Sequence, residues 1–331
     1  MSFKQSGFTA TRKKPSREYT SPRPAARRDH SRLANSGAAP KRRQNYHAAS
    51  PARVSRDGFL RAPYKGTVAA FRRAVWVYYR KHGRHNLPWR KTTNPYRLLV
   101  SEVMLQQTQV ERVVPFYRAF LKQFPTAQAL AEAPLARVLL AWQGLGYNRR
   151  AKMLQAAARA IAVHGVPRSV AALEELSGVG PYTARAVAAF AWNTDEVLIE
   201  TNIRTAGIHH FFPQRQDVSD TEIKAVLTRA LPPGRSREWH WALMDYGAYL
   251  KHSGISYNTH SRHYTKQSKF TGSFREARGV VLRTLAAGPM SAQPLYFVLG
   301  KDRAIQVKSA CRALMSEALI KKVNRRYQLP T

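Results

Sequence analysis

The sequence predicts an all-α protein with a basic N-terminal tail and a small second domain at the C-terminus. Apolar residues recur at helical spacing over most of residues 58–255, and patterns typical of strands are nearly absent there. The 331 residues, 44% of them hydrophobic, suffice for two folded units and a tail. We therefore expect a disordered basic tail (1–57), a helical domain (58–255), a basic linker (256–270) and a small domain (271–331).

The charge balance indicates a polyanionic partner. Lys and Arg number 55 against 19 Asp and Glu, a formal net charge of +36 at pH 7. Nucleic acid is the leading interpretation, and an anionic membrane surface is the second. The sequence shows no apolar run long enough to span a bilayer and no signal-peptide core, so we expect a soluble, intracellular protein of the cytoplasm or nucleoid. The single cysteine, Cys311, excludes an intrachain disulfide and any metal or iron–sulfur site built from cysteines.

The tail has the composition of a segment that cannot fold alone. It is rich in Arg, Lys, Ser, Pro and Ala and poor in large apolar side chains, so burial cannot offset its ordering entropy. Its basic clusters at residues 12–14, 27–28 and 41–43 would contact phosphates without sequence preference. A tail that only maintains solubility and a transit peptide are the alternatives.

Two helices are expected at the start of the helical domain. Apolar residues at helical spacing over residues 66–82 predict the first helix, and residues 87–90 follow as an irregular segment. Asn94 is suited to the N-cap of the second helix and Pro95 to its first position.

One carboxylate stands out in this second helix. Glu102 lies in a nearly apolar stretch, so it must be paired, solvated in a cleft or protonated. A glutamate on an exposed helix surface is the commoner alternative. Gln106, Gln107 and Gln109 follow at the helix end, and their amide groups suit the filling of gaps and hydrogen bonding to bases.

Further helices fill the rest of the domain. They are predicted over residues 113–124, 135–142, 151–163 and 182–192, with glycines as breaks between several of them. Another helix begins near Glu200, a position where the helix dipole favours an ionised carboxylate.

The turn at Leu176–Thr183 organises the chain. Gly178 and Gly180 can take the positive φ of a tight turn between two helices, and Pro181 suits the first turn of the second helix. Free amides at that helix start, together with the helix dipole, predict a phosphate site. A helix C-cap followed by a new helix is the alternative.

With these segments identified, residues 66–255 resemble the catalytic domain of the helix-hairpin-helix (HhH-GPD) DNA glycosylases, and within that superfamily the MutY-type adenine glycosylases. The resemblance implies two helical lobes with the active-site cleft between them, and double-stranded DNA as the partner. It rests on five segments in the family's order: Leu87–Arg90, Ser101–Val110, Gly144–Tyr147, Leu176–Thr183 and Trp241–Ala248.

The resemblance also implies roles in the cleft. Glu102 matches the general acid and base that protonates the departing adenine, and Asn202 matches the asparagine that supports the catalytic acids. Tyr182 falls where bifunctional relatives carry a Schiff-base lysine, which favours hydrolysis without strand cleavage. Glu200 falls where the family nearly always has Asp. Cleavage of an N-glycosidic bond needs a proton donor at the base and a carboxylate at the sugar, so Glu102 must be protonated at some point while Glu200 stays ionised.

The remaining site residues are expected to contact DNA. The target base would be rotated out of the stack, and the candidates to fill the gap are Gln106, Gln107 and Tyr147. Further DNA contacts are expected from Arg90 and from the hairpin residues Gly178, Val179, Gly180 and Thr183.

The chain departs from the family's cluster pattern. The family usually places four iron–sulfur cysteines directly after Ala248, and this segment contains none, so we expect no cluster and no other cofactor or metal. Histidines between residues 252 and 263 could suggest another metal. No Cys or carboxylate accompanies them, and cations such as Lys251 lie alongside, so a phosphate-contacting loop is the preferred interpretation.

The C-terminal residues also depart from the family. MutY-type enzymes end in a Nudix-like domain that recognises 8-oxoguanine, whereas three short helices and a basic strand pair predict a winged helix here. Lys308 and Arg312 on its longest helix would face a DNA groove. A winged helix used for protein contacts is the alternative. The residues of that helix expected in the core are Ile305, Ala310, Leu314 and Met315.

The sequence therefore predicts a monomeric, monofunctional DNA glycosylase that removes mismatched adenine or a related damaged purine. The rival is a non-catalytic DNA-binding or lesion-binding protein on a glycosylase scaffold, with Glu200 as the sign of lost activity. A mainly architectural DNA-binding protein is a third hypothesis, which rests on the charge alone.

Overall fold

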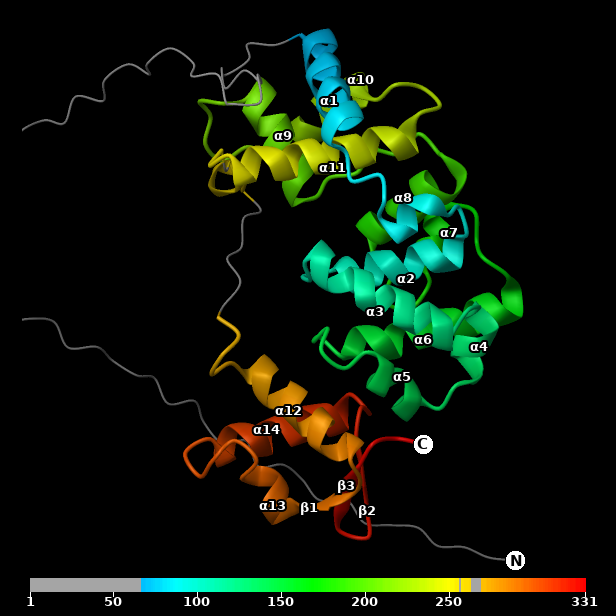
Figure 1. The fold of residues 1–331 in the computed structure, drawn as a ribbon, viewed down its shortest axis with the longest axis vertical. Helices are drawn as coiled ribbons and strands as arrows, with labels where there is room; N and C mark the ends of the chain where they lie inside the picture. Colours follow the sequence, from blue (N-terminus) through cyan, green and yellow to red (C-terminus); the bar gives the residue numbers. More distant parts are fainter. Residues whose placement is uncertain (1–66, 256, 263–268) are drawn as a thin grey trace, which may run out of the picture. The chain divides into compact units, whose positions relative to one another are not determined.

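Helices account for most of the described chain, as predicted. The computed structural model describes residues 67–331, except residues 256 and 263–268. The predicted tail and much of the predicted linker lie outside the described residues. The described residues belong to one compact unit, whose elements are shown in Figure 1.

One group of helices joins the start of the helical domain to its end. The four members are α1 (Val68–His82), α9 (Thr201–Phe211), α10 (Asp220–Ala230) and α11 (Ser236–His252), which pack against one another (Figure 1). Phe71 on α1 contacts the rings of His210 and Trp239 in their core. Because α1 packs against helices far along the chain, this group forms only when both ends of the domain come together.

The second helical group contains the segments between α1 and α9. Its members are η1 (Pro88–Lys91), α2 (Pro95–Leu105), α3 (Val110–Gln123), α4 (Ala127–Glu132), α5 (Leu135–Ala141), α6 (Arg149–His164), α7 (Val170–Glu174) and α8 (Pro181–Trp192). Asn94 caps α2 and Pro95 is its first residue, as predicted. The buried alanines of α8, including Ala184 and Ala188, allow α2 to pack closely against it. Helix α4, with six residues, was not predicted because so short a segment shows too little periodicity.

A buried ion pair connects the two groups and corrects one prediction. Arg90 on η1 donates to both carboxylate oxygens of Asp245 on α11, at 2.7 and 2.9 Å. Burial disfavours the ionised form of Asp245, but its bonds to Arg90 and Arg84 outweigh burial and hold its pKa below the usual value. The Arg90 side chain is 4% exposed. Its predicted role in DNA binding is therefore wrong, because its guanidinium is committed to this pair.

The C-terminal domain has three helices and a small sheet. Its elements are α12 (Phe274–Ala286), β1 (Met290–Ser291), α13 (Ala292–Tyr296), α14 (Ala304–Ser316), β2 (Lys321–Val323) and β3 (Arg326–Gln328). The strands are antiparallel in the order β1-β3-β2. The predicted ribbon corresponds to β2 and β3, whereas β1 was not predicted, since two residues show no alternation.

The face of α14 that enters the core differs from the prediction. Ile305 is 80% exposed and Met315 is 39% exposed, so neither belongs to the core. Val307 and Cys311 are fully buried beside the predicted Ala310 and Leu314. The helical period explains the error, because residues 307, 310, 311 and 314 form one face while 305 and 315 fall on the opposite one.

The helices of the described residues are too short or too polar to span a bilayer. Among residues 67–331, outside the gaps given above, none is long and apolar enough to cross a membrane.

Candidate active site

A cavity of about 360 Å³ lies where the two helical groups meet. Its walls come from η1 and α2, which are early in the sequence, and from α8, the start of α9 and α11, which are later in the sequence. Glu102, Tyr182, Glu200 and Asn202 all line it. The four residues predicted to act together are therefore brought to one pocket, which we call the base pocket.

Glu102 is a buried carboxyl on α2 with an environment that favours its neutral form. It is 6% exposed and faces the base pocket from a nearly apolar helix. Burial raises its pKa to about 7, the nearby charge of Glu200 adds to the increase, and a hydrogen bond with Tyr182 opposes it. Near neutral pH the carboxyl can therefore either donate or accept a proton.

Glu200 is the N-cap of α9. Its Oε1 accepts from the backbone amides of Asn202 and Ile203, both at 2.8 Å. The side chain thus folds back onto the helix start, as N-cap carboxylates do. Burial nevertheless raises its pKa, against these two hydrogen bonds and the charges of Lys251 and Arg204. The predicted position is confirmed, but burial outweighs the helix start that was expected to keep this carboxylate ionised.

Tyr182 lines the base pocket together with the two carboxyls. It is hydrogen bonded to Glu102, and burial together with the charges of Glu102 and Glu200 raises its pKa well above the usual value. Its hydroxyl therefore stays protonated and can orient Glu102, but it cannot form an imine as a lysine would.

The hairpin before α8 matches the prediction only in part. Gly178 has φ +79°, and a Cβ there would lie 2.7 Å from Cβ of Met153, so glycine is required. Gly180 has φ −96° and does not use the positive φ expected of it. Val179 is buried and its amide donates to the Leu176 carbonyl, so neither its side chain nor its N–H faces outward.

The first turn of α8 retains amides for a phosphate. Pro181 has no N–H, so the turn offers the amides of Tyr182 and Thr183. The Thr183 hydroxyl, in contrast, is buried and accepts from Nε2 of Gln106 at 3.3 Å. Gln106 therefore faces the protein, while Gln107 is exposed.

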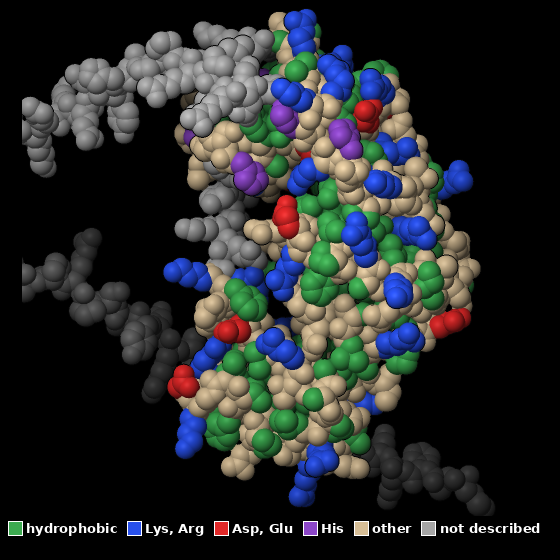
Figure 2. Space-filling model, viewed as in Figure 1, with side chains coloured by type: hydrophobic (Ala, Val, Ile, Leu, Met, Phe, Trp, Pro, Cys, Tyr) green, Lys and Arg blue, Asp and Glu red, His purple; other side chains and the backbone are tan. Residues whose placement is uncertain are grey.

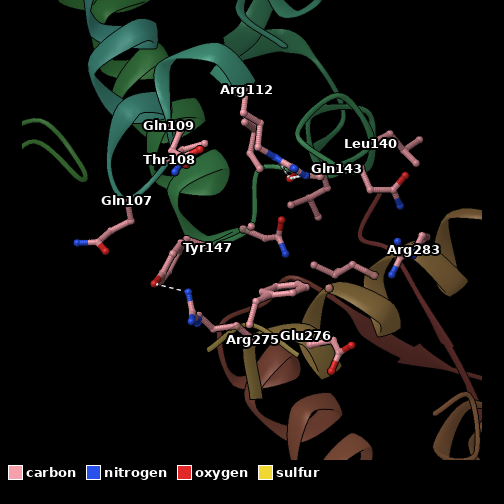
Figure 3. Close-up of a pocket in the computed structure, with 18 of the residues that line it drawn as sticks. Gln107, Thr108, Gln109, Arg112, Leu140, Gln143, Tyr147, Arg275, Glu276 and Arg283 are labelled. Carbon is pink, nitrogen blue, oxygen red and sulfur yellow. Dashed lines mark hydrogen bonds between the residues drawn. The ribbon is translucent and has the colours of Figure 1, made fainter. Parts of the chain in front are cut away.

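A second cavity, of about 450 Å³, lies beyond Gln107 and Thr108, which line both cavities. Its other walls come from the segment around Tyr147 and from the C-terminal domain (Figure 3). Gln107 and Tyr147 have φ of +58° and +47°, conformations that are uncommon for residues other than glycine and that are enriched at functional sites. We call this cavity the reading pocket.

Two arginines hold Tyr147 in the reading pocket. The Arg275 guanidinium of α12 donates to the Tyr147 hydroxyl at 3.0 Å (Figure 3). The guanidiniums of Arg275 and Arg150 each lie 5.4 Å from the centre of the Tyr147 ring. Arg150 also donates to the carbonyls of Val103 and Gln106 at the end of α2, where a cation complements the helix dipole. The sequence did not single out either arginine.

The chain matches known repair proteins over most of its length. Residues 100–238 match the model of the HhH-GPD superfamily base excision DNA repair protein. An adenine DNA glycosylase from Mycolicibacterium smegmatis is 36% identical over 264 residues, which are 72% of this chain and 89% of that protein. One from Mycobacterium tuberculosis is 34% identical over 282 residues, 76% of this chain and 91% of that protein. The chain belongs to the adenine DNA glycosylase family. It is a DNA N-glycosylase and binds DNA.

The chain is also similar to a solved structure. A thermostable thymine-DNA glycosylase aligns with a TM-score of 0.48 and 23% identity, over 55% of this chain and 86% of that one.

Lys251 lies on a helix beside the active site, whereas the sequence pattern predicted that it would accompany a phosphate-contacting loop. Helix α11 continues through His252, and the amine of Lys251 donates to the Asn202 side-chain oxygen at 3.1 Å. The sequence feature that could have indicated this role is the position of Lys251 four residues after Gly247, because residues four apart lie on the same side of a helix. Lys251 therefore belongs to the base pocket's surroundings.

The described histidine after α11, His260, makes contacts within the protein. Nδ1 of His260 lies 2.9 Å from the Arg215 carbonyl, and its Nε2 lies 3.1 Å from the Gln216 amide. Within the part of the glycosylase that the structure describes, no cluster of three or more His, Cys, Asp or Glu could hold a metal. His263 lies outside that part.

Proposed function

We propose that this glycosylase hydrolyses the N-glycosidic bond of adenine mispaired with 8-oxoguanine or G. The observation that carries the proposal is the pair of carboxyls, the buried Glu102 and the half-buried Glu200, which line one cavity with the phenol of Tyr182. The relatives that it matches are adenine DNA glycosylases, which supports adenine as the base.

Glu102 serves as the proton donor. With a pKa of about 7 it is protonated often enough near neutral pH to transfer a proton to the extruded adenine, and Tyr182 holds its orientation. Protonation of the base neutralises the charge that develops on the leaving group.

Glu200 serves the sugar side of the reaction. An ionised carboxylate there stabilises the positive charge that develops on the sugar when the bond breaks. The amides of Asn202 and Ile203 hold one of its oxygens, so the carboxylate keeps a fixed orientation. Water then completes the hydrolysis, with Glu102, deprotonated by the first step, as its general base.

The reading pocket accommodates the nucleotide opposite the extruded base. Gln107 stands between the two cavities, and Gln107 and Tyr147 fill the gap in the duplex. Arg275 adds a cation from the C-terminal domain, and the exposed Lys308 and Arg312 of α14 add phosphate contacts. Lys and Arg side chains lie over both domains on the face seen in Figure 2, where acidic side chains are few.

The enzyme acts as a monomer and without an iron–sulfur cluster. Its only cysteine is Cys311, buried in the core of the C-terminal domain, and no cysteine follows Ala248 in the segment where the cluster would be held. The residues of this chain therefore do not fit such a cluster.

The test is single-turnover release of base from duplexes with A opposite 8-oxoguanine, A opposite G, A opposite T, and deaminated or alkylated purines. We expect alkali-labile abasic sites in the first two, with no strand cleavage before alkali, and none opposite T. Tight binding with no product from any duplex would favour the non-catalytic rival. Product only from damaged purines would refute adenine as the substrate.

A further inference from the structure

Helices α9 and α11 touch backbone to backbone beside the base pocket. A Cβ at Gly247 would lie 2.0 Å from the backbone oxygen of Asn202 and 2.5 Å from its carbonyl carbon. No side chain fits there, so glycine allows the two helices to meet at Asn202, two residues after the α9 cap Glu200. This contact fixes which side of α11 faces the start of α9.

The contact also fixes the direction of Lys251. Residues four apart lie on the same side of a helix, so Lys251 projects past the start of α9 one turn after Gly247. Its amine donates to the Asn202 side-chain oxygen at 3.1 Å. The backbone amide of the same Asn202 donates to Oε1 of Glu200 at 2.8 Å. One residue thus joins the lysine to the catalytic carboxylate.

Few other charges can serve Glu200. Glu102 on α2 is a carboxyl as well, Tyr182 on α8 is neutral, and Arg204 on α9 is paired with Asp220 at 2.7 Å. Across the described residues no carboxylate lies within 4.0 Å of Lys251 to form an ion pair. Its positive charge can therefore act on Glu200. The low polarity of a buried environment strengthens such electrostatic effects.

Lys251 also stands in the segment where the resemblance places cluster cysteines, and the chain there does not fit a cluster. The residues after α11 are instead held by protein contacts. The amide of Val218, for example, donates to the His260 carbonyl at 2.9 Å. The segment after α11 is thereby tied to the residues that precede α10.

We propose that Lys251 is a positioning residue of the active site, which holds Asn202 against the cap of α9 and places a positive charge beside Glu200. This inference rests on the proposed function only for the catalytic meaning of Glu200. Lys251 does not touch the substrate, so its effect is transmitted through Asn202 and through charge.

The experiment compares Lys251→Met, which keeps the aliphatic stem, with Lys251→Arg, which keeps the charge. Lys224→Met, on the exposed surface of α10, controls for the loss of one cation from a DNA-binding protein. Rates of adenine release are measured in single turnovers at saturating enzyme from pH 5 to 9. At saturation, a lysine that only contacts phosphate leaves the rate unchanged.

We expect Lys251→Met to move the acidic limb of the rate profile upward by about one pH unit, which lowers the rate by up to about tenfold on that limb and by little on the plateau above it. Lys251→Arg should restore most of the loss, and Lys224→Met should match the wild type. An unmoved acidic limb in Lys251→Met would overturn the proposal, and so would an equal loss at every pH that Lys251→Arg fails to restore.

A second measurement is independent of activity. The titration of Glu200 is followed by NMR of ¹³C-labelled glutamate in the Glu102→Gln protein without DNA, with and without Lys251→Met. The proposal requires a higher pKa for Glu200 when the lysine is absent, and an unchanged titration contradicts it. If the wild type releases no base, the proposed function fails, while this titration still decides the role of Lys251.

Discussion

The base pocket and the reading pocket share Gln107 and Thr108 but are built in opposite ways. The base pocket presents its acids from a helix interior and a helix cap, and both carboxyls have raised pKa values because they are buried. The reading pocket presents exposed side chains from two loops, at Gln107 and Tyr147, that have rare backbone conformations. Chemistry requires groups of tuned pKa held in place, whereas insertion into a duplex requires groups that reach solvent.

The largest expected effect is on the base pocket. Glu102→Gln keeps the shape of the side chain but removes the proton donor, so we expect single-turnover base release to fall by about 10² to 10⁴. DNA binding should persist, because the residue is buried. Glu132→Gln on the exposed surface of α4 is the matched control. Glu102 would lose its assigned role if the variant kept its rate.

The same substitution should stabilise the protein at high pH. The pKa of Glu102 is about 7 in the folded protein and near 4.5 when exposed. A raised carboxyl pKa gives stability that is fully present below about 4.5 and is lost as the pH rises through about 7. Since Gln stays neutral, Glu102→Gln should raise the free energy of unfolding by up to about 3 kcal/mol at pH 8 and by little at pH 4.5. Denaturant unfolding at both pH values measures the difference, and equal effects at both would contradict a buried, neutral Glu102.

Arg275→Ala tests whether the reading pocket acts separately. The variant loses the hydrogen bond to Tyr147, so we expect about tenfold less discrimination between 8-oxoguanine and T opposite adenine. The limiting rate on the preferred duplex should change little. Arg118→Ala, an exposed position that lines neither pocket, is the control. A fall in the limiting rate without a change in discrimination would show that the two pockets are not separable.

Glu200→Asp is expected to have a smaller effect on the base pocket. Asp is among the best N-cap residues, so it should still accept from the α9 amides, and the rate should stay within a few fold of the wild type or rise. Single-turnover rates decide this. A complete loss would mean that the pocket depends on the longer side chain.

The smallest effects concern general DNA affinity. Removing the charge of Lys308 or Arg312 should lower the slope of log affinity against log salt by about 1 for each phosphate that the variant no longer neutralises, with no change in opposite-base preference. Deleting residues 1–57 should lower the slope further. Titrations between about 50 and 200 mM salt measure both, and an unchanged slope would exclude a contact with DNA.

The sequence by itself determined the helical class, the family and the residues of the base pocket. Helical spacing, the cap at Asn94 and a carboxylate in the nearly apolar helix α2 are local signals. They depend only on residues close in sequence, so they can be recognised before the fold is known. The position of Glu200 at a helix start was also visible. Its raised pKa was not, because burial depends on everything that packs around the residue.

Only the tertiary structure decided which cations serve the fold and which serve the sites. Arg90 looked like a DNA contact until Asp245, 155 residues away, proved to be its partner. Lys251 and Arg275 acquired their places from the approach of α11 to α9 and of α12 to Tyr147. The sequence alone does not determine the role of a charged side chain, because that role depends on which opposite charge or amide the fold brings within hydrogen-bonding distance.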